Sequence, residues 1–115
     1  MNANHFPKVF IPQLVERYDT GMKRFVPVFD FASAQAFGTL VPVLDKDDDP
    51  MFLARLTTKI RTALSVFTPH DYLLAVGDPS VIAVCSGLIL RQMDSMKMLK
   101  WDKKLARYLT LEIHP

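Results

Sequence analysis

The stretch whose residues come closest to a recognisable chemistry is Gly77-Asp78-Pro79-Ser80, which stands between a predicted strand and a predicted helix. A turn of this kind brings free amides at a helix amino terminus to the carboxyl end of a strand, where phosphate groups are often held. The composition argues against that use, because the turn has one glycine and no lysine, and Pro79 lacks an amide. Asp78 would repel a phosphate, and its side chain is expected to cap the helix that Pro79 begins. The favoured interpretation is a purely structural turn. Phosphate binding by Gly77, Asp78 and Ser80 is the alternative.

A second candidate site is the basic stretch near the carboxyl terminus, in which lysines and an arginine surround two aromatic residues. Such a surface can hold a phosphate backbone and stack bases. The same residues also suit a solvated hairpin, in which the aromatic rings pack across the strands and the lysines discourage aggregation at the sheet edge. The hairpin interpretation is favoured. The binding alternative would use Lys100, Trp101, Lys103, Lys104, Arg107 and Tyr108.

No set of residues suggests a catalytic centre. Cys85 lies in the most apolar part of the sequence and is predicted to be a buried, neutral thiol, which is a poor nucleophile. Ser80 and the His70-Asp71 pair would stand at opposite ends of the intervening strand, roughly 20 Å apart. With His5 and His114 near the termini, three scattered histidines make no zinc site. We therefore expect no enzymatic activity, no cofactor and no metal.

The acidic run Asp45 to Asp49 (DKDDD) superficially resembles the start of a calcium-binding loop. Pro50 stands where that loop needs glycine, and Leu56 stands where it needs a bidentate glutamate. The run instead suits the start of a helix, with Asp49 as the capping residue and Pro50 in the first turn.

Composition indicates a globular protein. The chain has 115 residues, half of them hydrophobic and 23% charged, which predicts a single domain over residues 1–115. One cysteine excludes an internal disulfide and favours a reducing compartment. No window is apolar enough for a membrane span, so we expect a cytoplasmic protein. A net charge of +2 does not by itself imply a nucleic-acid partner.

The stretch from Asp71 to Asp94 is the predicted centre of the fold. The apolar run 72–76 is typical of a strand covered on both faces, and the following helix, about 79–93, is apolar on nearly every side. This helix is therefore predicted to be enclosed. The small residues Ala83, Ser86 and Gly87 would allow another backbone to pack closely against it.

The other predicted elements complete a mixed sheet. A helix over about 50–67 shows clear amphipathic periodicity, and the runs 96–101 and 106–113 predict a hairpin around residues 102–104. The strand 72–76, the helix after it and the run 96–101 form a predicted right-handed crossover with parallel strands. The sequence thus predicts an α/β or α+β fold with a mixed sheet of about four to six strands, two main helices and a carboxyl-terminal β-hairpin.

The amino-terminal third is less regular. The run 8–11 (KVFI), bounded by Pro7 and Pro12, indicates an edge strand or an extended arm. Two similar phrases, FVPVFD at 25–30 and LVPVLD at 40–45, favour extended backbone that pairs together or flanks the sheet. Between them, FASAQAF at 31–37 predicts a short helix, capped by Asp30 and ended by Gly38.

Three phrases carry a resemblance: DYLLAVGDP at 71–79, LKWDKKLARY at 99–108 and FDFASAQAFG at 29–38. Together they resemble a family of small, functionally uncharacterised bacteriophage proteins. The resemblance implies a viral origin, and hence the host cytoplasm, but it carries over no site residues. Small phage proteins of this kind often bind host or viral components.

These observations predict a non-enzymatic interaction protein, a phage accessory factor that binds a host or viral macromolecule. The proline-containing edges and the hairpin are the candidate surfaces for self-association. The alternative from another class is a nucleic-acid or nucleotide-binding module that uses the basic hairpin.

Overall fold

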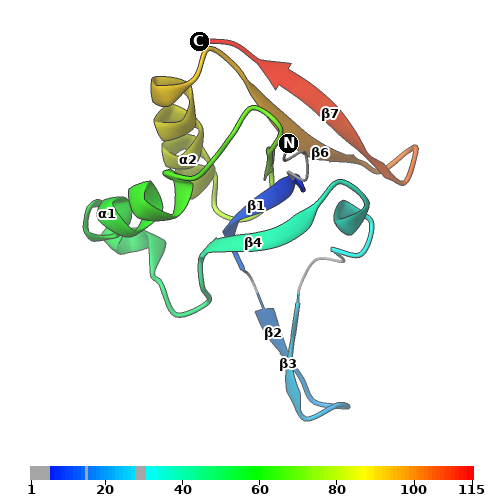
Figure 1. Ribbon diagram of the computed structural model, residues 1–115. Coiled ribbons are helices and arrows are strands. Elements are labelled where there is room, and N and C mark those ends of the chain that lie inside the picture. Colours follow the sequence, from blue (N-terminus) through cyan, green and yellow to red (C-terminus); the bar gives the residue numbers. More distant parts are fainter. Residues whose placement is uncertain (1–5, 15, 28–30) are drawn as a thin grey trace.

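The fold is built on one five-stranded sheet (Figure 1). The computed structural model describes residues 6–14, 16–27 and 31–115. In the sheet order the strands are β4 (Thr39–Leu44), β1 (Lys8–Gln13), β5 (Tyr72–Leu74), β6 (Met96–Asp102) and β7 (Arg107–Ile113). The first four are mutually parallel, and β7 runs antiparallel to β6. The remaining strands, β2 (Glu16–Asp19) and β3 (Arg24–Pro27), form a separate antiparallel ribbon.

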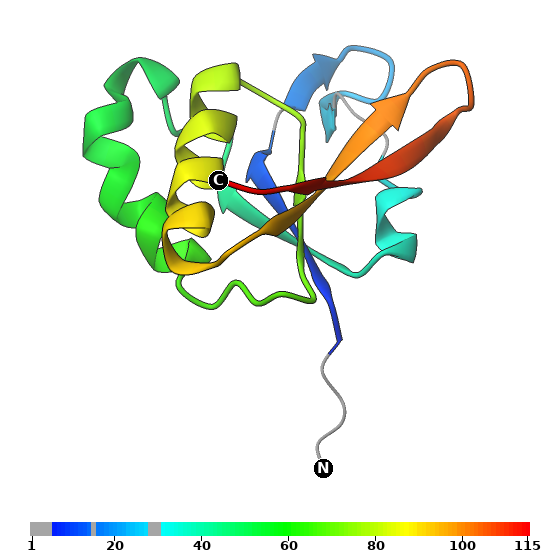
Figure 2. The same cartoon turned by 90° about the horizontal axis from the view of Figure 1, so that it is seen from above.

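Both long helices cover the same face of the sheet (Figure 2). These are α1 (Leu53–Leu64) and α2 (Pro79–Gln92), which pack against each other and over the sheet. Successive residues of β1 point to opposite faces. Phe10 joins the core under the helices, whereas Val9 and Ile11 join a second core on the other face with Ala34 of the short 3-10 helix η1 (Ala34–Ala36). Each face of the sheet therefore has its own apolar cluster.

Aspartate and proline mark the starts of the two segments that contain the long helices, as the sequence predicted. Asp49 accepts a hydrogen bond from the amide of Met51 (2.9 Å) and precedes the 3-10 helix η2 (Pro50–Phe52), which leads directly into α1. Asp78 accepts a hydrogen bond from the amide of Ser80 (2.8 Å), and Pro79 is the first residue of α2. Each aspartate accepts from an amide that has no partner inside the helix, that of Met51 or Ser80. The proline between them has no amide of its own that would need a partner.

The predicted fold class is confirmed. The structure has a mixed sheet with two helices, and its carboxyl-terminal β6–β7 pair is antiparallel, so the fold is of the α+β class. The predicted crossover from β5 through α2 to a parallel β6 is also present. None of the described helices is long and apolar enough to cross a membrane.

The prediction of an edge position for residues 8–11 is wrong. The strand β1 lies between β4 and β5, and Val9, Phe10 and Ile11 are fully buried. Pro12 is tolerated there because β5 is short and pairs with β1 only at Val9 and Phe10. The missing proline amide therefore costs no hydrogen bond to β5.

The two proline-containing phrases have different positions, and the described parts do not pair with each other. The second phrase lies in β4, where Pro42 stands on an edge strand. In the first phrase Phe25 to Pro27 belongs to β3, and residues 28–30 lie outside the described residues, as does the predicted cap Asp30. The short helix between the phrases is the single 3-10 turn η1.

The prediction that α2 is enclosed on all sides is wrong. Val81, Cys85 and Ile89 are fully buried against the sheet, but Ala83 and Gly87 are exposed. A side chain built on Gly87 would meet nothing within 4 Å. The small residues on this face therefore do not serve close packing against a neighbouring backbone.

Substitution of Gly87 by alanine is expected to raise the free energy of unfolding by about 0.5 to 1 kcal/mol, because alanine loses less backbone entropy than glycine in a helix interior. The open space beside Gly87 leaves the new methyl group without a clash. Urea unfolding followed by circular dichroism measures the change. A destabilised Gly87→Ala variant would show that another segment or molecule packs closely on this face.

Candidate functional site

The carboxyl ends of the four parallel strands bring every candidate segment to one edge of the sheet. Gln13 ends β1, the acidic run follows β4, Gly77 lies shortly after β5, and the basic turn follows β6. The order of the strands also reverses here: the chain passes from β1 to β4 on one side of β1, and then adds β5 and β6 on the other side. Ligands of open parallel sheets bind at such an edge. Each segment along this edge is therefore a candidate ligand site.

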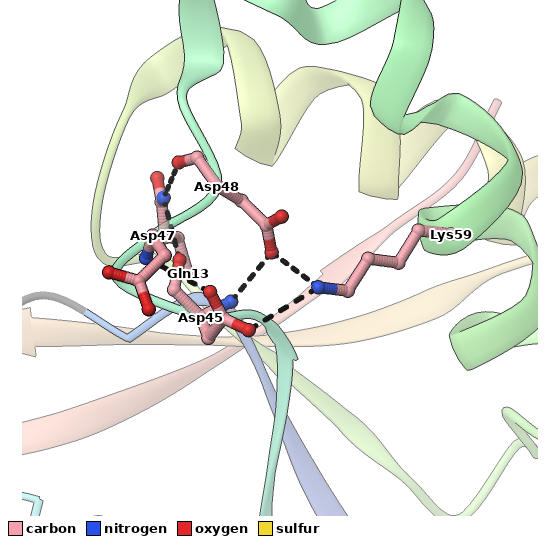
Figure 3. Close-up of polar contacts among 5 residues, drawn as sticks. All are labelled: Gln13, Asp45, Asp47, Asp48 and Lys59. Carbon is pink, nitrogen blue, oxygen red and sulfur yellow. Dashed lines mark hydrogen bonds and ion pairs between the residues drawn. The ribbon is translucent and has the colours of Figure 1, made fainter.

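A hydrogen-bonded network fills the edge beside β1 and β4 (Figure 3). The buried side chain of Gln13 donates from Nε2 to the carbonyl oxygens of Asp45 (3.1 Å) and Asp48 (2.6 Å). The carboxylate of Asp48 accepts from the amide of Asp45 (3.0 Å) and from Lys59 Nζ on α1 (2.5 Å). Asp45 in turn accepts from the amide of Asp47 (2.9 Å). The network ties the acidic run to β1 and to α1.

The carboxylates of Asp45 and Asp48 stabilise the loop by accepting hydrogen bonds from its own amides and from Lys59. The hydrogen bond from Lys59 holds the pKa of Asp48 below its ordinary value, and the hydrogen bond to Asp48 raises the pKa of Lys59. Within residues 6–14, 16–27 and 31–115 no three histidine, cysteine, aspartate or glutamate side chains are grouped so that they could hold a metal ion. A hollow of about 410 Å³ beside the loop has four carboxylates and one lysine, Lys46, among its eight lining residues. Its lining gives a phosphate little to bind.

The depressed pKa of Asp48 predicts an acid-dependent contribution to stability. The charged carboxylate stabilises the fold at any pH above its unfolded value of about 3.9, and this contribution is lost as pH falls through the lower folded pKa. An Asp48→Asn variant should therefore melt below the wild type at pH 6, and the difference should shrink between about pH 4 and pH 2. Thermal melts across this range measure it. A difference that is constant with pH would contradict the role of the charge.

Gly77, Asp78 and Ser80, the residues of the predicted phosphate turn, lie together, but the Asp78 carboxylate occupies the place that a phosphate would take. Gly77 has a φ of +99°, a conformation that favours glycine, and it lies against Gln13. The Asp78 carboxylate accepts hydrogen bonds from both the amide and the hydroxyl of Ser80, which lowers the pKa of Asp78. A phosphate would have to displace this carboxylate from the helix amino terminus. The geometry thus favours the structural interpretation of the turn.

The basic hairpin is present, but its basic and aromatic residues divide between the two faces of the sheet. Trp101 pairs with Tyr108 and Lys100 pairs with Leu109, so alternation places Lys100 on the face opposite the rings. Arg107 lies on the same face as Lys100. Lys103 and Lys104 belong to the turn, where the Asp102 carboxylate accepts from the amide of Lys104 (2.9 Å).

The two aromatic rings of the hairpin are packed against each other. Trp101 and Tyr108 meet edge to face with their centroids 4.9 Å apart, and Tyr108 is buried in the second core. Trp101 is 40% exposed, so of this pair only Trp101 offers substantial surface to a base. The hairpin therefore places four basic side chains and one accessible ring near its tip.

The candidate catalytic residues Cys85, Asp71 and Ser80 do not form one site. Cys85 is fully buried, and burial raises the pKa of its thiol to about 12. Asp71 is also fully buried and precedes β5, whereas Ser80 lies beyond the carboxyl end of that strand. The side chain of Asp71 accepts hydrogen bonds from Lys8 and Thr68, so it fastens the amino-terminal end of the sheet.

The sequence predicted extended backbone at 25–30, but it did not predict the pairing of this stretch with residues 16–19 in the β2–β3 ribbon. Tyr18 pairs with Phe25, and the rings meet edge to face at 5.4 Å. Each of these side chains is 52% exposed, and Met22 in the turn is 54% exposed. Residues 16–19 (ERYD) contain one apolar residue, and four residues are too few to separate a short strand from a loop.

Comparison with known proteins identifies a family. No curated protein and no solved structure matches the chain. One family model, described as Phage Pam3 gp32-like protein, matches residues 7–115, which is nearly the whole chain. The match includes all three phrases that carried the resemblance to bacteriophage proteins. The chain therefore belongs to the Phage Pam3 gp32-like protein family.

Proposed function

We propose that this phage-family protein is a non-enzymatic binding protein, and that its β2–β3 ribbon docks onto a protein partner. The observation that carries the proposal is the half-exposed aromatic pair Tyr18 and Phe25 on a ribbon that projects from the sheet (Figure 1). Among the residues that the structure describes, the two strands of the ribbon pair only with each other. Their apolar side chains therefore add little to either core of the domain.

The two faces of the ribbon differ in chemistry. Tyr18 and Phe25 share one face, and the register places Arg17 and Arg24 on the other. Aromatic residues, methionine and arginine are enriched in protein interfaces, where a few buried rings supply most of the binding energy. The partner surface that matches the ring face has an apolar recess for Tyr18 and Phe25.

Contacts at the base of the ribbon hold it in place for binding. Lys46, from the acidic run, lies 3.9 Å from the centre of the Phe25 ring and 3.8 Å from the Glu16 carboxylate. At the tip, Asp19 accepts hydrogen bonds from the amides of Gly21 (2.8 Å) and Met22 (3.1 Å). An isolated two-stranded ribbon is marginally stable in water. These contacts reduce the entropy that a partner would have to overcome in ordering it.

A non-enzymatic role is supported by the polar residues along the carboxyl edge of the sheet, because their hydrogen bonds stabilise the fold. Gln13, Asp48 and Asp78 all have hydrogen-bond partners within the protein. The one cysteine is a buried thiol with a raised pKa. These side chains are used to position loops and helix termini, which leaves the exposed ribbon as the surface best suited to function.

The test is capture of a partner from phage-infected bacterial lysate by tagged wild type and by two variants. A Tyr18→Ser and Phe25→Ser double variant should lose the captured protein, because its interface anchors are removed. The matched control is Val66→Ser, which removes another large apolar side chain, 57% exposed, after the end of α1. Capture that survives in the double variant would rule out the ribbon as the docking surface.

The second candidate function is nucleic-acid binding by the hairpin tip, and one observation favours it. Lys100, Lys103, Lys104 and Arg107 are exposed, and none forms an ion pair with any residue that the structure describes. Unpaired basic side chains are available to phosphates, and Trp101 beside them is available for stacking.

Lys103→Glu with Lys104→Glu should weaken binding to single-stranded DNA and flatten its salt dependence. If both lysines contact phosphates, the slope of log affinity against log salt should fall by roughly 1.4. Fluorescence anisotropy across salt concentrations measures the slope. The control is Arg61→Glu, which reverses a charge at an exposed position on α1. Wild-type protein that binds no DNA at low salt would remove this candidate.

A further inference from the structure

The two edges of the five-stranded sheet are protected differently. At one edge, β4 carries Pro42 in its middle, and proline interrupts the row of amides that another strand would need. At the other edge, β7 offers seven residues with no proline and no lysine. Natural sheets usually block such edges, because an open strand recruits another strand. The open edge of β7 therefore calls for an explanation.

The side chains of β7 are also incompletely covered. Leu109, Leu111 and Ile113 share the face on which the helices lie, and Ile113 packs against the core beneath them. Leu111 remains 38% exposed. On the other face, Thr110 and Glu112 are exposed. An added strand beside β7 would cover Leu111 and would leave the polar residues in contact with water.

We infer that β7 pairs with β7 of a second copy, antiparallel about Thr110, so that two five-stranded sheets join into one. This register pairs all seven residues of β7, and a register centred on Leu109 or Leu111 pairs fewer. It places each Leu109 opposite Leu111 of the other copy and each Tyr108 opposite Glu112. The two Thr110 residues face each other, a favourable cross-strand pair, and no like charges are opposed.

A second copy suits this edge better than an unrelated peptide because the sequence of β7 is complementary to itself. The strand has an odd number of residues, and its central residue is uncharged. Its leucines lie at positions symmetric about that residue, so both leucine pairs meet on the same face. A two-fold axis through Thr110 satisfies both strands at once, as closed dimers require.

Charge substitution at Thr110 tests the inference. The wild type should sediment as a dimer of 13.1 kDa chains in analytical ultracentrifugation. Thr110→Lys and Thr110→Glu each place like charges opposite each other, and each should raise the dimer dissociation constant at least about tenfold. Mixing the two variants should restore a dimer, because lysine then faces glutamate. Thr110 is exposed, so both variants should keep the wild-type circular dichroism spectrum.

The control is Thr58→Lys, which adds the same charge at an exposed position on α1. It should dimerise as the wild type does. A wild type that stays monomeric at about 1 mM would overturn the inference, since a dimer with a dissociation constant below about 1 mM would be populated at that concentration. A dimer that persists equally in both Thr110 variants would also overturn it.

Discussion

Replacement of Asp71 by asparagine is expected to lower the free energy of unfolding by about 2 to 4 kcal/mol. The Asp71 side chain is fully buried, and its Oδ1 accepts from the amide of Lys8 (2.8 Å). Its Oδ2 accepts from the amide (2.8 Å) and the hydroxyl (3.0 Å) of Thr68. Asparagine has nearly the same shape, but its NH₂ group would face a donor on one of these two sides.

The matched control for this prediction is Asp78→Asn. Asp78 also accepts two hydrogen bonds, but it lies at an accessible helix terminus where asparagine caps as well as aspartate does. Urea unfolding should show a large loss for Asp71→Asn and little change for Asp78→Asn. Equal changes in the two variants would mean that the buried carboxylate does not fasten β1 to the loop before β5.

Replacement of Gly38 by alanine is expected to lower the free energy of unfolding by about 2 to 3 kcal/mol. A side-chain carbon on Gly38 would lie 2.3 Å from the carbonyl oxygen of Pro7, where only backbone could move aside. The same carbonyl accepts a hydrogen bond from the amide of Thr39 (3.0 Å), which begins the β1–β4 pairing. Relief of the clash would therefore disturb the first residues of two strands.

The Gly87→Ala variant described above is the internal control, because it makes the same chemical change in open space. The two substitutions should shift the urea midpoint in opposite directions. A neutral Gly38→Ala variant would contradict the close approach of the β4 entry to the chain before β1.

Local signals predicted the second half of the fold. The aspartate and proline pairs at 49–50 and 78–79 fixed where the helical segments start, because capping depends on residues next to each other in sequence. The hairpin after α2 was equally local. The capping role of Asp78 also anticipated why the Gly77 to Ser80 turn holds its own carboxylate.

Long-range relations were not predicted. The central place of β1 depends on β5, more than 60 residues later, and nothing in the run 8–11 encodes that pairing. The exposed face of α2 was missed because apolar composition does not reveal how much of a helix the sheet covers. The β2–β3 ribbon was missed because its aromatic residues lie in strands of only four residues. The surface that we propose for binding was thus the part least visible in the sequence.

The central claim is that the sheet and helices form a scaffold and that the ribbon makes the functional contact. The most direct measurement is photo-crosslinking in infected cells, with a photoreactive phenylalanine analogue placed at Phe25 in one protein and at Val66 in another. Both positions are more than half exposed, at 52% and 57%. We predict one discrete adduct with a protein from Phe25 and none from Val66. The same adducts from both positions, or an adduct from Val66 alone, would contradict the account.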